Sequence, residues 1–276
     1  MGCLLGLAVG DALGAPVEFC EPGTFLEIRD YTSGGAWNLP AGYWTDDTSM
    51  ALALADSMLQ CHDLVEADVM AKFGAWMQWG TYSSTGVCFD IGNTTRVNIS
   101  RYLLSGIYQP ASSENASASN GSIMRLAPIM TAWWHRADVH ELAARQSMIT
   151  HGNEACVACC RELALLCSQA IAGVDVVTEL RTFAQQQTQV VSTSAAVDTL
   201  IAAKWAVGSS NNFSEAVLRA VNLGGDADTV AAVAGQIAGS IWGLSGIPSH
   251  WISNLYDSQR LANLAEALYN LGQSHS

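Results

Sequence analysis

Apolar residues recur at helical spacing along almost the whole chain, and this periodicity decides the fold class. It predicts helices over residues 48–60, 66–79, 94–105, 123–134, 138–150, 153–172, 175–188, 194–207, 213–222, 229–243 and 258–272. No stretch of the sequence shows the sustained period-two alternation of a half-buried strand. We therefore expect an all-α fold, in which one domain, residues 1–276, forms a single compact orthogonal bundle of many helices.

The N-terminal segment carries a glycine at every fourth position, at Gly2, Gly6, Gly10 and Gly14. On a helix these residues form one bare stripe, which lets another backbone approach closely. The stripe therefore predicts a tightly buried helix. The same segment lacks a basic region and is interrupted by Asp11, so it is a poor signal peptide and too short to span a membrane.

The net charge indicates which kinds of partner the protein can bind, and the cysteine content indicates its cellular compartment. The net charge of −13 disfavours nucleic-acid backbones and anionic membranes as partners. Eight scattered cysteines without a secretory signal fit a reducing cytoplasm, where we expect a soluble monomer. Four of the cysteines lie between Cys156 and Cys167, but no second Cys-x-x-Cys pair completes a zinc site. On a helix, Cys156, Cys160 and Cys167 would share one face and pack as small apolar residues.

Two acidic clusters lie 180 positions apart, and each begins an alanine-rich apolar run. The first is Thr45-Asp46-Asp47-Thr48, and the second is the Gly-Gly-Asp-Ala-Asp-Thr segment of residues 224–229. Helix capping explains one such residue in each cluster, but not three or four. Neither cluster has a lysine or arginine within several positions, so its carboxylates must be solvated, protonated or bound to a cation.

The donor types select the kind of cation. Carboxylate and hydroxyl oxygens without cysteine or histidine suit Mg²⁺, Mn²⁺ or Ca²⁺. Four aspartates and two threonines are more than one Mg²⁺ takes from a protein, so two ions about 3.5–4 Å apart fit the set better. The candidate ligands are Thr45, Asp46, Asp47, Asp226, Asp228 and Thr229.

Six segments of this sequence match the pattern of a known family, in the family's order, from residue 2 to about residue 243: GCLLGLAVGDALGAPVEF, WTDDTSM, FDIGNTT, NGSIMRLAP, THGNEA and NLGGDADTVAAVAGQIAG. They resemble the ADP-ribosylglycohydrolase family, which includes the dinitrogenase-reductase-activating glycohydrolases. The resemblance implies an all-α fold, two Mg²⁺ or Mn²⁺ ions held by the six residues above, and hydrolysis of a bond to ADP-ribose.

The resemblance also implies roles for single residues. Glu18, Asp90 and Asp47 become the candidate catalytic residues, and either Glu18 or Asp90 would transfer the proton. The candidate substrate-binding residues are Asn120, Gly121, Ser122, Arg125 and His151. On chemistry alone, Glu18 is an ordinary loop acid, Asp90 a turn residue, and Arg125 and His151 structural residues. Residues 109–122, which by composition read as a flexible linker, become a substrate loop.

Several functions stay open at this point. ADP-ribosyl-arginine on a protein is the first choice of substrate, ahead of serine-linked ADP-ribose, O-acetyl-ADP-ribose and ADP-ribosylated nucleic-acid ends. A two-metal phosphoesterase fits the carboxylates equally well, but not the FDIGNTT and NGSIMR segments. A non-catalytic, crystallin-like member is the third alternative, although such a member should have lost some of the six ligands.

Overall fold

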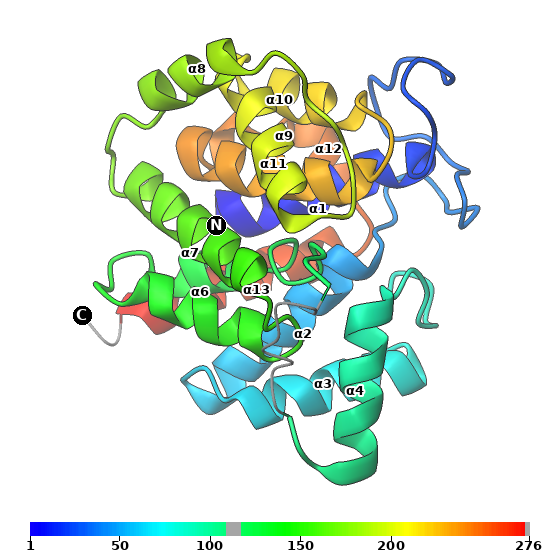
Figure 1. The fold of residues 1–276 in the computed structure, drawn as a ribbon, viewed down its shortest axis with the longest axis vertical. Helices are drawn as coiled ribbons and strands as arrows, with labels where there is room; N and C mark the ends of the chain where they lie inside the picture. The colour runs from blue at the N-terminus through cyan, green and yellow to red at the C-terminus, as the bar shows by residue number, and fades with distance from the viewer. Residues whose placement is uncertain (109–116, 274–276) are drawn as a thin grey trace.

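The computed structural model describes residues 1–108 and 117–273, in which every regular element is a helix (Figure 1). The α-helices are α1 (Gly2–Gly14), α2 (Asp46–Cys61), α3 (Glu66–Trp79), α4 (Asn93–Ser105), α5 (Ala127–Trp133), α6 (Val139–Met148), α7 (Glu154–Ile171), α8 (Val177–Gln186), α9 (Ala196–Gly208), α10 (Phe213–Val221), α11 (Ala227–Trp242), α12 (Ser249–Asn254) and α13 (Ser258–Gln273). Two short 3₁₀ helices, η1 (Ala15–Val17) and η2 (Leu244–Gly246), follow α1 and α11. The predicted all-α fold class is confirmed.

The predicted helices and the observed helices differ at two places. The helix expected over residues 123–134 begins only at Ala127, because residues 120–125 form a turned segment and Pro128 occupies the first turn of α5. The short helix α12 has no counterpart among the predicted helices, since six residues are too few to show a helical period. Part of the predicted substrate loop, residues 109–116, lies outside the described residues.

Helix α1 packs against α11, and the two backbones touch along the glycine stripe. A Cβ atom added at Gly6 would overlap the carbonyl oxygen of Gly235, and one added at Gly235 would overlap the carbonyl oxygen of Gly6. Gly2 and Gly239 are related in the same way. Only residues without a side chain permit this approach. All residues of α1 are buried, so the prediction of a tightly buried helix is confirmed.

The α1–α11 register is antiparallel, and this places the acidic residues together. Toward its C-terminal end, α1 packs with Gly10 against Ala231 and with Gly14 against the backbone of Asp228. Asp11 therefore lies on the α1 turn that faces the N-terminal end of α11. The chain then continues through η1 to Glu18 in the same region. Segments from opposite ends of the sequence thus meet at one point.

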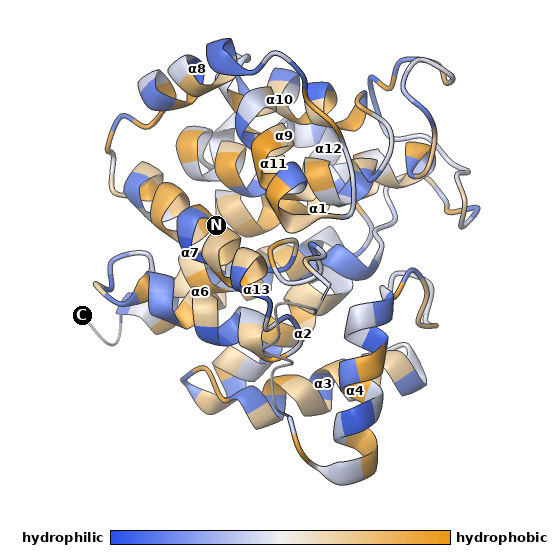
Figure 2. Ribbon diagram, in the orientation of Figure 1, coloured by the Kyte–Doolittle hydropathy of each residue, from blue (hydrophilic) through white to orange (hydrophobic). Residues whose placement is uncertain are grey.

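One apolar core connects the described helices, with buried members from Cys3 in α1 to Leu271 in α13. In Figure 2 the outer helices α8 and α4 alternate blue and orange around their surfaces, as expected for helices with one face in water. None of the helices in the described residues combines the length and the hydropathy that crossing a bilayer requires.

The cysteine-rich stretch forms part of α7. Cys156, Cys160 and Cys167 are buried there, as expected for small apolar residues on one helix face. All eight cysteines are free thiols. Within residues 1–108 and 117–273, the groups of side chains that could hold a metal ion contain only carboxylates. The zinc alternative therefore has no support in the structure.

Candidate metal and substrate site

The first turn of α2 is capped by Asp11 of α1. Oδ1 of Asp11 accepts hydrogen bonds from the backbone N and the Oγ1 of Thr45, both at 2.9 Å. Oδ2 of Asp11 accepts from the backbone N and the Oγ1 of Thr48, at 2.9 and 2.6 Å. In the described structure neither Thr45 nor Asp226 makes a side-chain capping bond to its own helix. Local capping therefore does not account for the acidic clusters.

Two groups of carboxylates lie close enough to hold metal ions, and they share one residue. Asp11, Asp47 and Asp228 each offer an oxygen within 4.8 Å of the others. Glu18, Asp90 and Asp228 form a second group by the same measure. Asp228 belongs to both, so the sites are adjacent. The two acidic clusters of the sequence do meet in space, and Asp11 joins them.

The threonine hydroxyls among these carboxylates lie near more hydrogen-bond acceptors than they have protons to donate. Oγ1 of Thr45 lies 2.9 Å from Asp11 Oδ1, 3.2 Å from Asp228 Oδ2 and 3.3 Å from Asp47 Oδ2. One hydroxyl proton can satisfy only one of these contacts. Oγ1 of Thr229 also lies 3.3 Å from Asp47 Oδ2. Among the described atoms, Oδ1 of Asp47, Oδ1 of Asp228 and Oδ2 of Asp90 are buried without a hydrogen-bond partner.

Burial makes the charged forms of these acids costly. Desolvation, with the neighbouring carboxylates adding to it, raises the pKa of Asp46, Asp47 and Asp228 well above the usual range. The same causes raise the pKa of Asp90 to about 11. Desolvation raises the pKa of Glu18 to about 7 despite its hydrogen bond to Trp37. Oxygen donors that are crowded, buried and partly unpaired fit a hard divalent cation, which supplies the missing positive charge.

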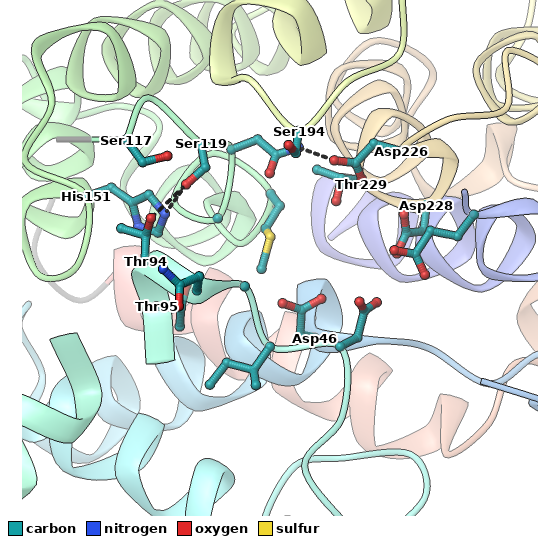
Figure 3. Close-up of a pocket in the computed structure, with 18 of the residues that line it drawn as sticks. Asp46, Thr94, Thr95, Ser117, Ser119, His151, Ser194, Asp226, Asp228 and Thr229 are labelled. Carbon is teal, nitrogen blue, oxygen red and sulfur yellow. Dashed lines mark hydrogen bonds between the residues drawn. The ribbon is translucent and has the colours of Figure 1, made fainter. Parts of the chain in front are cut away.

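A cavity of about 600 Å³ opens beside the carboxylates. Its size lies in the range of small-molecule pockets. Figure 3 shows its two ends: Asp46, Asp226 and Asp228 lie on one side, and Ser119 and His151 on the other. Nine predicted site residues line it: Glu18, Asp46, Asp90, Asn120, Gly121, His151, Asp226, Asp228 and Thr229.

Thr45 and Asp47 do not line the cavity, because they are fully buried behind its acidic end. Asn120 connects the two ends, since its Nδ2 donates to Oδ2 of Asp226 and to Oγ1 of Thr199, both at 3.0 Å. Gly121 packs against the ring of His151, which leaves no room for a side chain there. The predicted residues therefore form one continuous surface with a carboxylate end and a hydroxyl-rich end.

Two predicted substrate-binding residues are absent from the cavity wall. Arg125 is fully buried below it, where its guanidinium donates to Gln146 and Thr150. The structure therefore places Arg125 away from the cavity surface, because the turn at residues 120–125 directs this side chain into the core. Ser122 is also fully buried, and its hydroxyl contacts Ser147 at 2.9 Å. The same turn therefore keeps the Ser122 side chain off the cavity wall.

Asp11, Trp37 and Ser119 are among the residues of the site that sequence reasoning did not single out. Asp11 was visible as the one acid in an apolar, glycine-rich helix, but it was interpreted only as evidence against a signal peptide. Trp37 lines the cavity, and its Nε1 donates to Oε2 of Glu18 at 2.8 Å. Ser119 also lines the cavity and contacts His151. Ser119 lies within the expected substrate loop of residues 109–122, but nothing in that loop singles it out, and nothing near Trp37 distinguishes it from a surface residue.

Comparisons with known proteins agree with this geometry. A sequence profile described as ADP-ribosylglycohydrolase matches residues 1–276. The chain is 39% identical to the ADP-ribosylarginine hydrolase Tri1 of Pseudomonas putida (strain GB-1), over 98% of this chain and 77% of that protein. It is 36% identical to the ADP-ribosyl-[dinitrogen reductase] glycohydrolase of Rhodospirillum rubrum, over 92% of this chain and 89% of that protein.

A solved structure is similar over nearly the same length. It is described as an ADP-ribosylglycohydrolase-related protein complex and superposes with a TM-score of 0.84 at 38% sequence identity. The match covers 98% of this chain and 96% of the other. Sequence and fold therefore agree along the whole length, including all the segments that build the acidic cavity.

Proposed function

This chain belongs to the ADP-ribosylglycohydrolase family, and we propose that it is a metal-dependent hydrolase that releases ADP-ribose from modified arginine side chains of proteins. The observation that carries the proposal is the pair of carboxylate groups that share Asp228 at one end of a cavity of about 600 Å³. The choice of arginine is supported by relatives described as ADP-ribosylarginine hydrolases at 38–39% identity.

We propose that Asp46, Asp47, Asp226 and Asp228, with the hydroxyls of Thr45 and Thr229, hold two Mg²⁺ or Mn²⁺ ions. A bound divalent cation would act as a Lewis acid that stabilises negative charge on oxygen at the reacting centre. Both carboxylate oxygens of Asp11 already accept two hydrogen bonds each from Thr45 and Thr48. These hydrogen bonds hold the first turn of α2 in place.

The two ends of the cavity suit the two parts of ADP-ribose. At the hydroxyl-rich end, Ser119, Asn120 and Gly121 offer short side chains and close backbone to the diphosphate. The distal ribose then reaches the acidic end, where cleavage at its anomeric carbon develops positive, oxocarbenium-like charge. The carboxylates of Glu18 and Asp90 lie at this end, and either is placed to move the proton. Their negative field also favours a cationic guanidinium as leaving group.

Trp37 positions Glu18, and replacing it with phenylalanine tests the role of that acid. The W37F change keeps an aromatic ring near Phe89, whose centroid lies 5.6 Å away, but it removes the N–H donated to Glu18. We expect kcat to fall roughly tenfold with KM little changed, as for other outer-shell partners of catalytic groups. Steady-state kinetics on ADP-ribosyl-arginine protein would measure this split.

Trp79 supplies the matched control. It lies at the end of α3, is 74% exposed and does not line the cavity. W79F should leave both kinetic constants unchanged. Equal kcat in W37F and wild type would show that the contact between Trp37 and Glu18 has no part in catalysis.

Product analysis tests the proposed activity directly. The protein is incubated with ADP-ribosyl-arginine protein and Mg²⁺ or Mn²⁺, with and without EDTA, and free ADP-ribose is separated from AMP. We expect ADP-ribose, and none of it with EDTA present. Release of AMP would indicate the phosphoesterase class. Turnover only of serine-linked, O-acetyl- or nucleic-acid-linked ADP-ribose would reassign the leaving group, and no product from any linkage would favour the non-catalytic alternative.

We also propose a cytoplasmic location. The support is chemical: all eight cysteines are free thiols, and five of them are buried. Buried unpaired thiols suit reducing surroundings. The monomeric state stays a prediction.

A further inference from the structure

Arg125 is a buried cation without an ion pair among the described residues, and its hydrogen bond to Thr150 links it to His151 at the hydroxyl-rich end of the cavity. Its side chain is 0% exposed, and in the described part of the chain no ion pair includes it. Nε donates to Oε1 of Gln146 at 2.6 Å, and the guanidinium lies 4.5 Å from the centre of the Phe73 ring. Burial lowers the pKa of Arg125 to about 9, which still leaves it charged at neutral pH. A buried charge of this kind fixes the direction of every hydrogen bond that it enters, because arginine only donates.

The bond from Arg125 to Thr150 determines where the Thr150 proton goes. Nη2 of Arg125 donates to Oγ1 of Thr150 at 2.8 Å. The same oxygen lies 2.7 Å from Nδ1 of His151. No other acceptor within hydrogen-bond distance of this hydroxyl occurs among the described residues. The arrangement in which the Thr150 proton has an acceptor is the one in which this hydroxyl accepts from Arg125 and donates to Nδ1 of His151.

An accepting Nδ1 leaves the single ring proton of neutral His151 on Nε2. Nε2 lies 3.1 Å from Oγ of Ser119, so the ring donates to that hydroxyl (Figure 3). Desolvation and the charge of Arg125 lower the pKa of His151 to about 3, which keeps the ring neutral. The ring fills the space that a side chain at position 121 would need, since a Cβ there would lie 2.8 Å from Cε1 of His151.

Because the Ser119 hydroxyl accepts a hydrogen bond from His151, its own proton is available for donation to another acceptor. It is directed at Oγ1 of Thr94 across 3.3 Å, a long contact between two residues that both line the cavity. An anionic oxygen is a stronger acceptor than a hydroxyl and would take over this proton. The chain of donors thus runs from the buried charge of Arg125 to the cavity surface.

We propose that Arg125 and Thr150 are positioning residues that hold His151 in the Nε2–H tautomer, so that Ser119 presents its hydroxyl proton to the diphosphate of ADP-ribose. The identity of the anion rests on the proposed function, whereas the order of donors rests on the structure alone. The arrangement gives the cavity wall a hydrogen-bond donor of fixed direction at Ser119, while the positive charge of Arg125 stays buried outside the cavity. It also accounts for a fully buried arginine beside a site made of acids.

Variants at Thr150 distinguish a role of its hydroxyl in hydrogen bonding from a role of its side chain in packing. T150V removes the hydroxyl at nearly the same volume, and T150S keeps it. Thr131 in α5 is the matched control, since it is also buried and its Oγ1 has no partner among the described residues. S119A removes the last donor while leaving the bond from Thr150 to His151 in place.

Two readouts on the full chain test the proposal: the His151 tautomer from ¹⁵N NMR of the ring, and the Kd of ADP-ribose from calorimetry. We expect Nε2–H in wild type, T150S, T131V and S119A, and loss of this single tautomer in T150V. ADP-ribose should bind roughly tenfold more weakly to T150V and S119A, as for one lost hydrogen bond to a charged group. T150S and T131V should bind like wild type.

An Nδ1–H tautomer in wild type, or wild-type affinity in S119A, would overturn the proposal even if T150V failed to fold. Wild-type protein that shows the Nε2–H tautomer but does not bind ADP-ribose would instead contradict the proposed function. The failures of the two proposals are therefore distinguishable.

Discussion

Replacing Asp228 with asparagine should abolish turnover and also remove the thermal stabilisation that Mg²⁺ or Mn²⁺ gives the wild-type protein. Asp228 is the residue shared by the two carboxylate groups, so its loss weakens both at once. Loss of several kcal/mol of transition-state stabilisation corresponds to a rate decrease of at least about 10³-fold. A cation at a hundredfold excess over its Kd should raise the Tm of the wild-type protein by roughly 5–10 °C.

The folded state of D228N should survive without metal. Asparagine is close in shape to aspartate and replaces a buried carboxyl group whose charged form is costly, so the metal-free Tm should equal or exceed that of wild type. Differential scanning calorimetry with and without Mn²⁺ measures both effects. Asp175 is exposed and lies far from these groups in sequence, so D175N should keep the metal response. A full metal response or full activity in D228N would contradict the assignment.

A single methyl group on Gly6 should destabilise the protein strongly, although alanine is the better helix former. The added Cβ would overlap the carbonyl oxygen of Gly235 and lie 3.1 Å from Cε2 of Phe213. Because the obstacle is backbone, α1 and α11 must separate along their contact. We expect G6A to lower the free energy of unfolding by about 3 kcal/mol or more, at the upper end of overpacking effects. G6V should leave little folded protein.

Gly74 in α3 provides the matched control for a helical glycine. The three atoms nearest to a Cβ there all belong to the side chain of Leu103, with Cδ2 the nearest at 2.9 Å, and that flexible side chain can move. The gain in helix propensity, up to about 1 kcal/mol, should largely offset the shift. Urea unfolding of G6A and G74A compares the two sites. Similar stability of both variants would show that the contact between α1 and α11 is looser than the structure indicates.

Periodicity was enough to predict most helices, because buried helix faces leave a repeating apolar pattern. The stripe of Gly2, Gly6, Gly10 and Gly14 also predicted the close approach of a second backbone. It did not identify α11 as the partner, since Gly235 and Gly239 gave no separate signal. Short elements such as α12 have too few residues to show a period.

The site was predictable where its residues are unusual for their surroundings. The aspartates at residues 46–47 and 226–228 stood out because no base lies near them, and the fold brings them together. Asp11, Trp37 and Ser119 become site residues only through tertiary contacts that local sequence does not encode. Arg125 closely follows the predicted substrate loop in the sequence, yet the turned segment directs it away from the cavity. Neighbours in sequence can therefore have opposite orientations.

The most direct test of the central claim is anomalous X-ray scattering from crystals of the protein equilibrated with Mn²⁺. We expect two Mn²⁺ peaks at the acidic end of the cavity, both in contact with Asp228. Asp46, Asp47, Asp226 and the hydroxyls of Thr45 and Thr229 should supply further ligands. The cysteine-rich face of α7 should show no peak. Absence of manganese from these carboxylates, or its binding only elsewhere, would contradict the account.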